Sequence, residues 1–506
     1  MAILFLTFLD NTVVSPILTG IQSGLHAGVT DLQWVVGAYA LSFASLMLLF
    51  GALADLFGRT TILLGGVVIF LVGSVVCAVA DSPTTLIVGR VIMGVGAAAS
   101  EPGTLSMIRH VVPEPHRRAR ALGVWAAVSG LALATGPVLG GLMVGAWSWR
   151  AVFWFNVIFG GIALVAGVVA LPRFVPAEHG RIDMAGFILS ALALGSVTYA
   201  TIAGETAGYR SGHVIGWFVT AGLSLVAFVV VEHRSTHPMV EIRYLGQRVF
   251  FGANAVAFAS YFSVFSIFFF VALYLEVVVG ASPFALALDF APLLIGMVVG
   301  SLLAGSWVSR RGARLPMVVG ALVAAGGVLA TDIVIGPHAS VASLGWAMGL
   351  AGLGFGIVVV PVTSSALSAV PAAHSGMAAS TVNTARELGA VAGVAVLGSV
   401  VNGQLTVDLM SRLAAIGVPP SFRQEVISAL TTGTLSAQAA KAAGTSSAAV
   451  QAIINKVVGA AYGALTHGLH LALGTSAILL LVAAATAALA TRDHGGFAAV
   501  ASDLGE

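Results

Sequence analysis

Five ionisable residues stand within long apolar runs of this chain, and they are the first candidates for chemistry. They are Asp10, Arg90, Glu101, Arg386 and Glu387. An ionisable side chain at the centre of a bilayer costs about 2.5 to 3.5 kcal/mol on insertion scales, so each must face a partner or a cavity. Residues of this kind mark the pathways of protons, ions and polar substrates.

Arg90 and Glu101 have a spacing that places them on one helix face. They are eleven residues apart, and at about 100° per residue this returns to nearly the same face, about 16 Å along the axis. We therefore expect both charges to face one cavity. Three acids against two bases leave one carboxyl unpaired, and such a buried carboxyl can exchange a proton near neutral pH. The alternative is that these residues form structural ion pairs between helices.

The elements that position these residues are predicted to be transmembrane helices. The chain has 506 residues, of which 58% are hydrophobic and 8% charged, and this composition excludes a water-soluble globule. Apolar blocks of about 20 residues recur, each long enough to cross about 30 Å of hydrocarbon. We count fourteen such blocks and predict an all-α polytopic membrane protein with fourteen transmembrane helices.

The arginines predict the orientation, because basic residues of short loops stay in the cytoplasm. With the N-terminus inside, most arginines fall on the cytoplasmic side, and the short outer loops hold only Arg150 and Arg210. Both termini are thus predicted to be cytoplasmic. The stretch 403–462 is rich in Ala, Ser and Thr, and we predict an outer loop with one or two surface helices.

Two glycine-containing motifs predict where helices turn or meet. GALADLFGR holds Gly51, Asp55, Gly58 and Arg59, and we expect a tight cytoplasmic hinge in which Asp55 caps the next helix and Arg59 pairs with a neighbouring helix end. In GLALATGPVLGG the small residues permit close helix contact and a proline kinks the helix. The residues concerned are Gly130, Gly136, Pro137, Gly140 and Gly141.

Other classes of function lack the residues that they need. The sequence has no GxxxxGK[ST] or HExxH motif, and Cys77 is its one cysteine, which excludes disulfides and Cys-based metal clusters. A formal charge of +2 offers no surface for nucleic acid. We expect no enzyme, no metal and no cofactor, with the proton gradient as the coupling ion.

Several of these motifs together resemble the 14-helix drug:proton antiporters of the major facilitator superfamily, which include quaternary-ammonium-compound exporters. LDNTVVSPIL resembles the helix 1 signature at Asp10 and Thr12, and GALADLFGR the loop motif between helices 2 and 3. LIVGRVIMGVGAA resembles the helix 4 motif, which would make Arg90 the residue linked to proton transfer, and GLALATGPVLGG resembles the antiporter motif of helix 5. Glu101 departs from the apolar residue usual at its position, and Glu387 stands where many members have Gln.

The resemblance implies two six-helix bundles that move by alternating access. A repeat of GALADLFGR as GSWVSRRGAR also favours two halves. We predict a first bundle over 1–172, an inserted helix pair with linkers over 173–249, and a second bundle over 250–506 that includes the loop 403–462.

The function that follows is proton-driven export of amphipathic, cationic compounds across the cytoplasmic membrane. Asp10 and Glu387 are expected to bind proton or substrate, Glu101 is a third such site, and Arg90 modulates the carboxyls. We expect a monomer surrounded by lipid. The alternatives are an exporter of one endogenous metabolite, antibiotic or lipid, and a non-transporting membrane enzyme or sensor.

Overall fold

The structure is a computed structural model, and it is built from helices. It describes residues 1–27, 29–112, 114–172, 183–235, 242–279, 285, 288–336, 341–371, 374–416, 419, 423 and 448–490. Within these ranges it contains no strand, which confirms the predicted all-α class.

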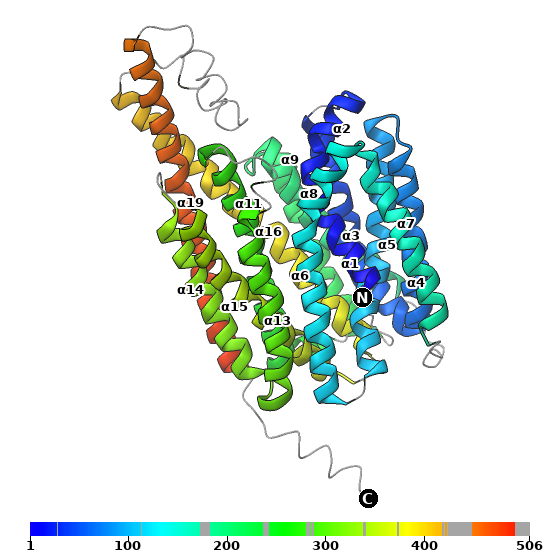
Figure 1. Ribbon diagram of the computed structural model, residues 1–506. Helices are drawn as coiled ribbons and strands as arrows, with labels where there is room; N and C mark the ends of the chain where they lie inside the picture. The colour runs from blue at the N-terminus through cyan, green and yellow to red at the C-terminus, as the bar shows by residue number, and fades with distance from the viewer. Residues whose placement is uncertain are drawn as a thin grey trace, which may run out of the picture.

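The N-terminal third of the chain forms one group of helices. Its elements are α1 (Ala2–Val13), η1 (Ser15–Ile17), α2 (Leu18–Leu25), α3 (Val29–Phe57), α4 (Arg59–Ala78), α5 (Pro83–Val111), α6 (Pro115–Ala146) and α7 (Arg150–Ala170). Within this group α5 packs against α3 and α4, α1 against α6, and α4 against α7. These helices are blue to cyan in Figure 1.

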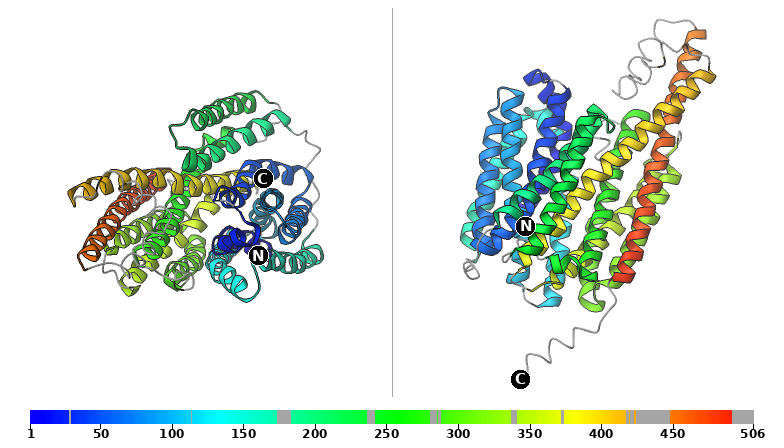
Figure 2. Two further views of the ribbon diagram at one scale, coloured as in Figure 1. Left: turned by 90° about the horizontal axis from the view of Figure 1, so that it is seen from above. Right: turned by 180° about the vertical axis from the view of Figure 1, so that it is seen from behind.

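The C-terminal half of the chain forms a second group. Its elements are α11 (Arg248–Tyr274), the π-helical turn η2 (Leu275–Val279), α13 (Ala291–Arg311), α14 (Arg314–Val334), α15 (Val341–Ser368), α16 (Ser375–Ala415) and α19 (Ala448–Ala490). Here α13 and α14 pack against α15, and α11 packs against α16 and α19. The two groups meet where α6 contacts α13 and where α16 contacts α3 and α5, and they stand side by side in Figure 2.

Two helices between these groups form a pair of their own. α8 (Met184–Ala207) and α9 (Gly212–Arg234) pack against each other, and α8 also contacts α3 and α16, one helix from each group. Seen from above in Figure 2, the pair lies at one side of the molecule. The short α10 (Ile242–Leu245) then leads to α11.

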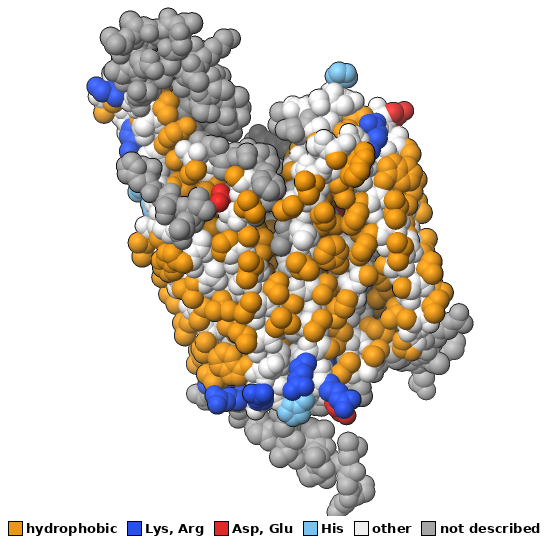
Figure 3. Space-filling view, viewed as in Figure 1, with side chains coloured by type: hydrophobic (Ala, Val, Ile, Leu, Met, Phe, Trp, Pro, Cys, Tyr) orange, Lys and Arg blue, Asp and Glu red, His pale blue; other side chains and the backbone are white. Residues whose placement is uncertain are grey.

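The surface and the helix lengths are those of a multi-pass membrane protein. Twelve helices of the described residues are long and apolar enough to cross a membrane. The predicted number of fourteen is not confirmed, because α1 has only 12 residues and α16 is not among the twelve. Figure 3 shows hydrophobic side chains over the middle of the visible face.

Arginines gather at one end of the helices, which we call the arginine-rich end. It is formed by the α3–α4, α5–α6 and α13–α14 turns, and blue side chains mark it at the lower edge of the helices in Figure 3. Its members include Arg59, Arg117, Arg118, Arg310 and Arg311. The opposite end carries the α4–α5 and α8–α9 turns.

The segment 403–462, predicted as an outer loop, is helical at both ends. α16 continues to Ala415 and α19 begins at Ala448, so each helix extends well beyond the span predicted for it. Most of the remainder, including 424–447, lies outside the described residues. The α16 extension holds Leu, Met, Arg and Gln, and the α19 extension holds several Ala. These residues have high helix propensity, so both helices continue into the segment.

Candidate functional site

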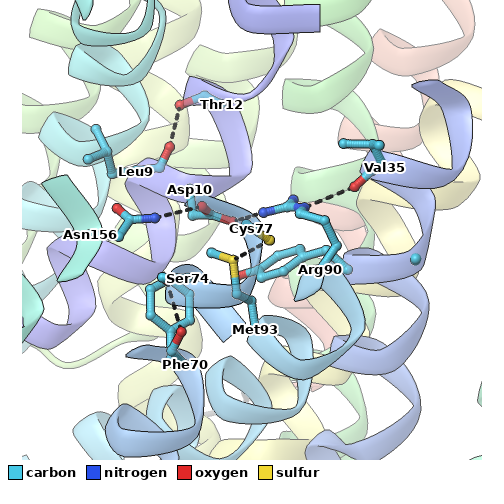
Figure 4. Close-up of polar contacts among 12 residues, drawn as sticks. Leu9, Asp10, Thr12, Val35, Phe70, Ser74, Cys77, Arg90, Met93 and Asn156 are labelled. Carbon is cyan, nitrogen blue, oxygen red and sulfur yellow. Dashed lines mark hydrogen bonds and ion pairs between the residues drawn. The ribbon is translucent and has the colours of Figure 1, made fainter. Parts of the chain in front are cut away.

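Asp10 and Arg90 form a buried ion pair between α1 and α5. Arg90 Nη1 lies 2.5 Å from Asp10 Oδ2, and Asn156 of α7 donates from Nδ2 to Asp10 Oδ1 at 3.1 Å. The Asp10 and Arg90 side chains are 0% and 2% exposed. Figure 4 shows the carboxylate between its two donors. Three helices of the first group thus meet at one carboxylate.

Arg90 makes two further contacts with α3. Its Nε donates to the carbonyl of Val35 at 2.9 Å, and its guanidinium lies 4.4 Å from the centre of the Tyr39 ring. We expected Arg90 and Glu101 to face one cavity, but the charge partner of Arg90 is Asp10. About 16 Å of helix axis separates residues eleven apart, so a shared helix face does not bring the two side chains together.

Arg386 is a second buried charge, and it lies on α16 of the other group. Its guanidinium donates to Asn383 Oδ1 at 3.0 Å and to Thr363 Oγ1 of α15 at 2.5 Å. It also lies 5.4 Å from the ring centres of both Trp125 and Tyr261. Arg386 thus lies between α6 and α11, where aromatic rings and neutral oxygen atoms contact its guanidinium.

Glu101 is buried on α5 and faces this second position. It is 2% exposed, and its Oε2 atom has no hydrogen-bond partner. Its electrostatic interactions are with Glu387 and Arg386. The neighbouring Thr104 hydroxyl donates to the Glu101 carbonyl at 2.7 Å and accepts from Trp125 Nε1 at 3.0 Å. Carboxyl groups from α5 and α16 therefore lie within electrostatic range of each other and of one guanidinium.

Asp55 joins the two groups at the arginine-rich end. Its carboxylate is 2.6 Å from Arg59 Nη2 and accepts from the backbone N–H groups of Gly376 and Met377, at 3.1 and 3.0 Å. Those N–H groups belong to the first turn of α16, where a helix favours negative charge. The prediction that Asp55 caps the helix following it was wrong, since the N-cap residue of α4 is Gly58 and no side chain caps this helix.

Glycines of the same motif permit this arrangement. Gly58 has a φ of 93°, a conformation open to glycine that side chains disfavour. Gly51 faces α16, where an added Cβ would overlap the side chain of Ser380.

Two more contacts close the arginine-rich end between α5 and the α15–α16 turn. Arg109 donates to the carbonyls of Leu367 and Val370, the latter at 2.8 Å. The hydroxyls of Ser106 and Ser375 are 3.4 Å apart. In this conformation the two groups are therefore joined at the arginine-rich end.

The glycines of α6 divide by what they face. An added Cβ at Gly136 would overlap the Thr12 side chain, and one at Gly140 would overlap the Val13 carbonyl and Pro16. Gly130 has room against α13, and Gly141 has no neighbour within 4 Å of an added Cβ. Gly136 and Gly140 thus let α1 approach α6. The side chain of Pro137 lies outside the described part, so the kink stays a prediction.

Sequence reasoning missed the neutral residues that hold the charges. They are Tyr39, Trp125, Asn156, Tyr261 and Thr363. The one available signal was Asn156, an amide within the otherwise apolar run AVFWFNVIF. Within the described residues no group of three or more His, Cys, Asp or Glu side chains could hold a metal ion.

Comparison with known proteins decides the family. The Major Facilitator Superfamily model matches residues 1–394. This chain belongs to that family. Its members are transporters, which confirms the expectation that the chain is not an enzyme.

Relatives and solved structures agree with this assignment. The multidrug resistance protein Stp of Mycobacterium tuberculosis is 32% identical over 424 residues, 84% of this chain and 78% of the relative. The puromycin resistance protein pur8 of Streptomyces alboniger is 34% identical over 402 residues, 79% of this chain and 80% of the relative. The human organic anion transporter MFSD10 shares the fold, with a TM-score of 0.58 at 14% identity over 96% of this chain and 98% of that one.

Proposed function

We propose that this protein exports drug-like molecules from the cell in exchange for protons. The arginine-rich end faces the cytoplasm, both termini are cytoplasmic, and α1 and α16 complete fourteen transmembrane helices. The helices of 1–172 and of 250–506 act as two bundles that alternate access to a central site, with the 173–249 pair beside them. The protein works as a monomer in the cytoplasmic membrane.

The observation that carries the proposal is the set of buried charges inside apolar helices. Asp10 and Arg90 lie within one bundle, and Glu101 and Arg386 lie at the contact between the bundles. Charged groups in such positions are costly and are retained for the passage of protons or charged substrates. The name of Stp, a multidrug resistance protein, supports drugs as the cargo.

Buried acids also favour cationic cargo. Glu101 lacks a hydrogen-bond partner at Oε2, and a carboxylate in a low-dielectric site attracts a cation far more strongly than it does in water.

The decisive experiment uses everted membrane vesicles. With a pH gradient imposed, a lipophilic cation should enter the vesicles, and its addition should release protons from them. A protonophore should abolish both signals. Uptake that persists without the gradient would contradict proton coupling.

The second candidate is an exporter of a single compound. The name of pur8, a puromycin resistance protein, favours it. A panel of unrelated toxic compounds, tested in deletion and overexpression strains, separates the two candidates. Resistance to several scaffolds supports the multidrug exporter, and resistance to one scaffold supports the second candidate.

A further inference from the structure

Glu101 and Glu387 belong to different bundles but share one electrostatic environment. Glu101 lies on α5 and Glu387 on α16, and these helices are in contact. Each carboxyl interacts with Arg386, and Glu101 also interacts with Glu387. Any separation of the bundles at this contact changes the distance between the two acids.

The other charged residues nearby, Arg90 and Asp10, already form an ion pair with each other. Arg90 lies on the same helix as Glu101. α3 contributes Tyr39 and α11 contributes Tyr261 to the surroundings of the two acids, and both are neutral phenols near pH 7. Among the residues that the structure describes, Arg386 is therefore the cation that faces the pair, and it balances one carboxylate of the two.

We propose that Glu101 and Glu387 share one proton, and that this proton holds α5 and α16 together in the conformation described above. With both acids ionised, the group formed with Arg386 carries one net negative charge inside apolar helices. Repulsion across the α5–α16 contact then favours opening of the arginine-rich end. This inference rests on the proposed function, because it names the site at which the coupling proton acts.

The Glu101 Oε2 atom has no hydrogen-bond partner, which supports a proton at this carboxyl. A buried charge without a partner is strongly unfavourable, whereas a carboxyl that holds a proton or binds a cation does not leave that charge uncompensated. A departing proton and an arriving organic cation would both act on the carboxyl groups of Glu101 and Glu387.

Disulfide trapping at the arginine-rich end measures this coupling without any substrate. The Ser106 and Ser375 hydroxyls are 3.4 Å apart, so Ser106→Cys with Ser375→Cys reports the joined state, in a Cys77→Ala background. Cross-linking rates in native membranes are compared with and without Glu101→Gln at each pH. The thiolate fraction changes equally in both proteins, so it cancels in the ratio of the two rates.

The ratio of the Glu101→Gln rate to the parent rate should rise roughly tenfold between about pH 6 and about pH 8, because one linked proton changes an equilibrium by up to tenfold per pH unit. Glu387→Gln should behave in the same way. The double variant should cross-link more slowly than either single variant, because Arg386 is then left without an anion. The exposed Glu114 provides the control, and Glu114→Gln should leave the ratio at one.

A ratio independent of pH for both single variants, or a double variant that cross-links as fast as the single ones, would overturn the shared proton. These outcomes are independent of transport. A protein that exports drugs with a flat ratio retains the proposed function and loses only this inference. A pH-dependent ratio in a protein that moves no substrate would do the reverse.

Discussion

Asp10 and Arg90 neutralise each other's buried charge. Their contact of 2.5 Å is almost fully excluded from solvent. Removing one member of a buried pair typically costs about 3 to 5 kcal/mol, because the remaining charge stays desolvated without a counter-ion. A substitution at this pair therefore acts on stability as well as on coupling.

We predict that Asp10→Asn abolishes gradient-driven export and lowers the stability of the folded protein by about 3 kcal/mol. Adding Arg90→Gln should restore most of the stability, since no uncompensated charge remains, but should not restore export. Thermal unfolding of the purified protein, followed by tryptophan fluorescence, measures the first effect, and vesicle uptake measures the second. An unchanged melting temperature for Asp10→Asn would argue against a stabilising pair.

Glu387 differs from Asp10 because, within the described part of the chain, no arginine forms an ion pair with its carboxylate. We predict that Glu387→Gln weakens export of permanently charged lipophilic cations about tenfold and that of neutral compounds of similar size much less. The reason is the stronger attraction of a charge in a low-dielectric site. Initial uptake rates in vesicles provide the measurement, with Asp81→Asn at the exposed opposite end as control. Equal losses for both kinds of compound would show that Glu387 does not attract the cationic substrate directly.

Glu101 has other charged neighbours than Arg90, the residue with which it was expected to face one cavity. Arg90 is taken by Asp10, and the charged neighbours of Glu101 are Glu387 and Arg386. Neutralising Glu101 therefore acts at the contact between the bundles and leaves the Asp10–Arg90 pair in place.

At the scale of elements, close contact between α1 and α6 decides how firmly Asp10 is held. Gly136 lies against Thr12, two residues after Asp10, and Gly140 lies against Val13. The Thr12 hydroxyl also donates to the Leu133 carbonyl of α6 at 3.0 Å. The helix that carries the carboxylate is thus fixed to α6 by van der Waals contact and one hydrogen bond.

We predict that Gly136→Ala destabilises the protein by about 1 to 3 kcal/mol, the usual cost of overpacking, and reduces export. Gly141→Ala is the matched control, because an added Cβ there meets no atom within 4 Å. The two variants share chemistry, helix and motif, and they differ only in what the Cβ meets. Melting temperatures of both proteins in detergent test this, and similar values would show that α1 adjusts freely to the extra methyl group.

At the scale of the whole molecule, the arginine-rich end is the basis of the proposed orientation in the membrane. Asp81 is exposed on the turn between α4 and α5, and Glu114 is exposed where α6 begins at the other end. Native Cys77 is buried, so an introduced cysteine gives the main labelling signal.

With basic turns in the cytoplasm, Asp81→Cys should react with a membrane-impermeant maleimide in intact cells. Glu114→Cys should react only in everted vesicles or after permeabilisation. The extent of labelling, read by a mass shift on a gel, gives the result directly. The reverse pattern would invert the proposed orientation and turn the direction of transport around.

The sequence by itself determined which residues carry charge into the membrane and which family the chain belongs to. A charge within an apolar run can be recognised without knowing its neighbours in space. The residues identified in this way are Asp10, Arg90, Glu101, Arg386 and Glu387. The helical class and the motifs are equally local, since each depends on residues close together in the chain.

Only the tertiary structure decided which of these residues act on one another. It paired Arg90 with Asp10, placed Glu101 with Glu387 and Arg386, and set Asp55 on the first turn of α16, far along the chain. It also supplied the neutral partners, such as Asn156 and Trp125. Ion pairs and hydrogen bonds depend on distances of a few ångströms between helices, and helix packing sets those distances, whereas spacing along one helix does not.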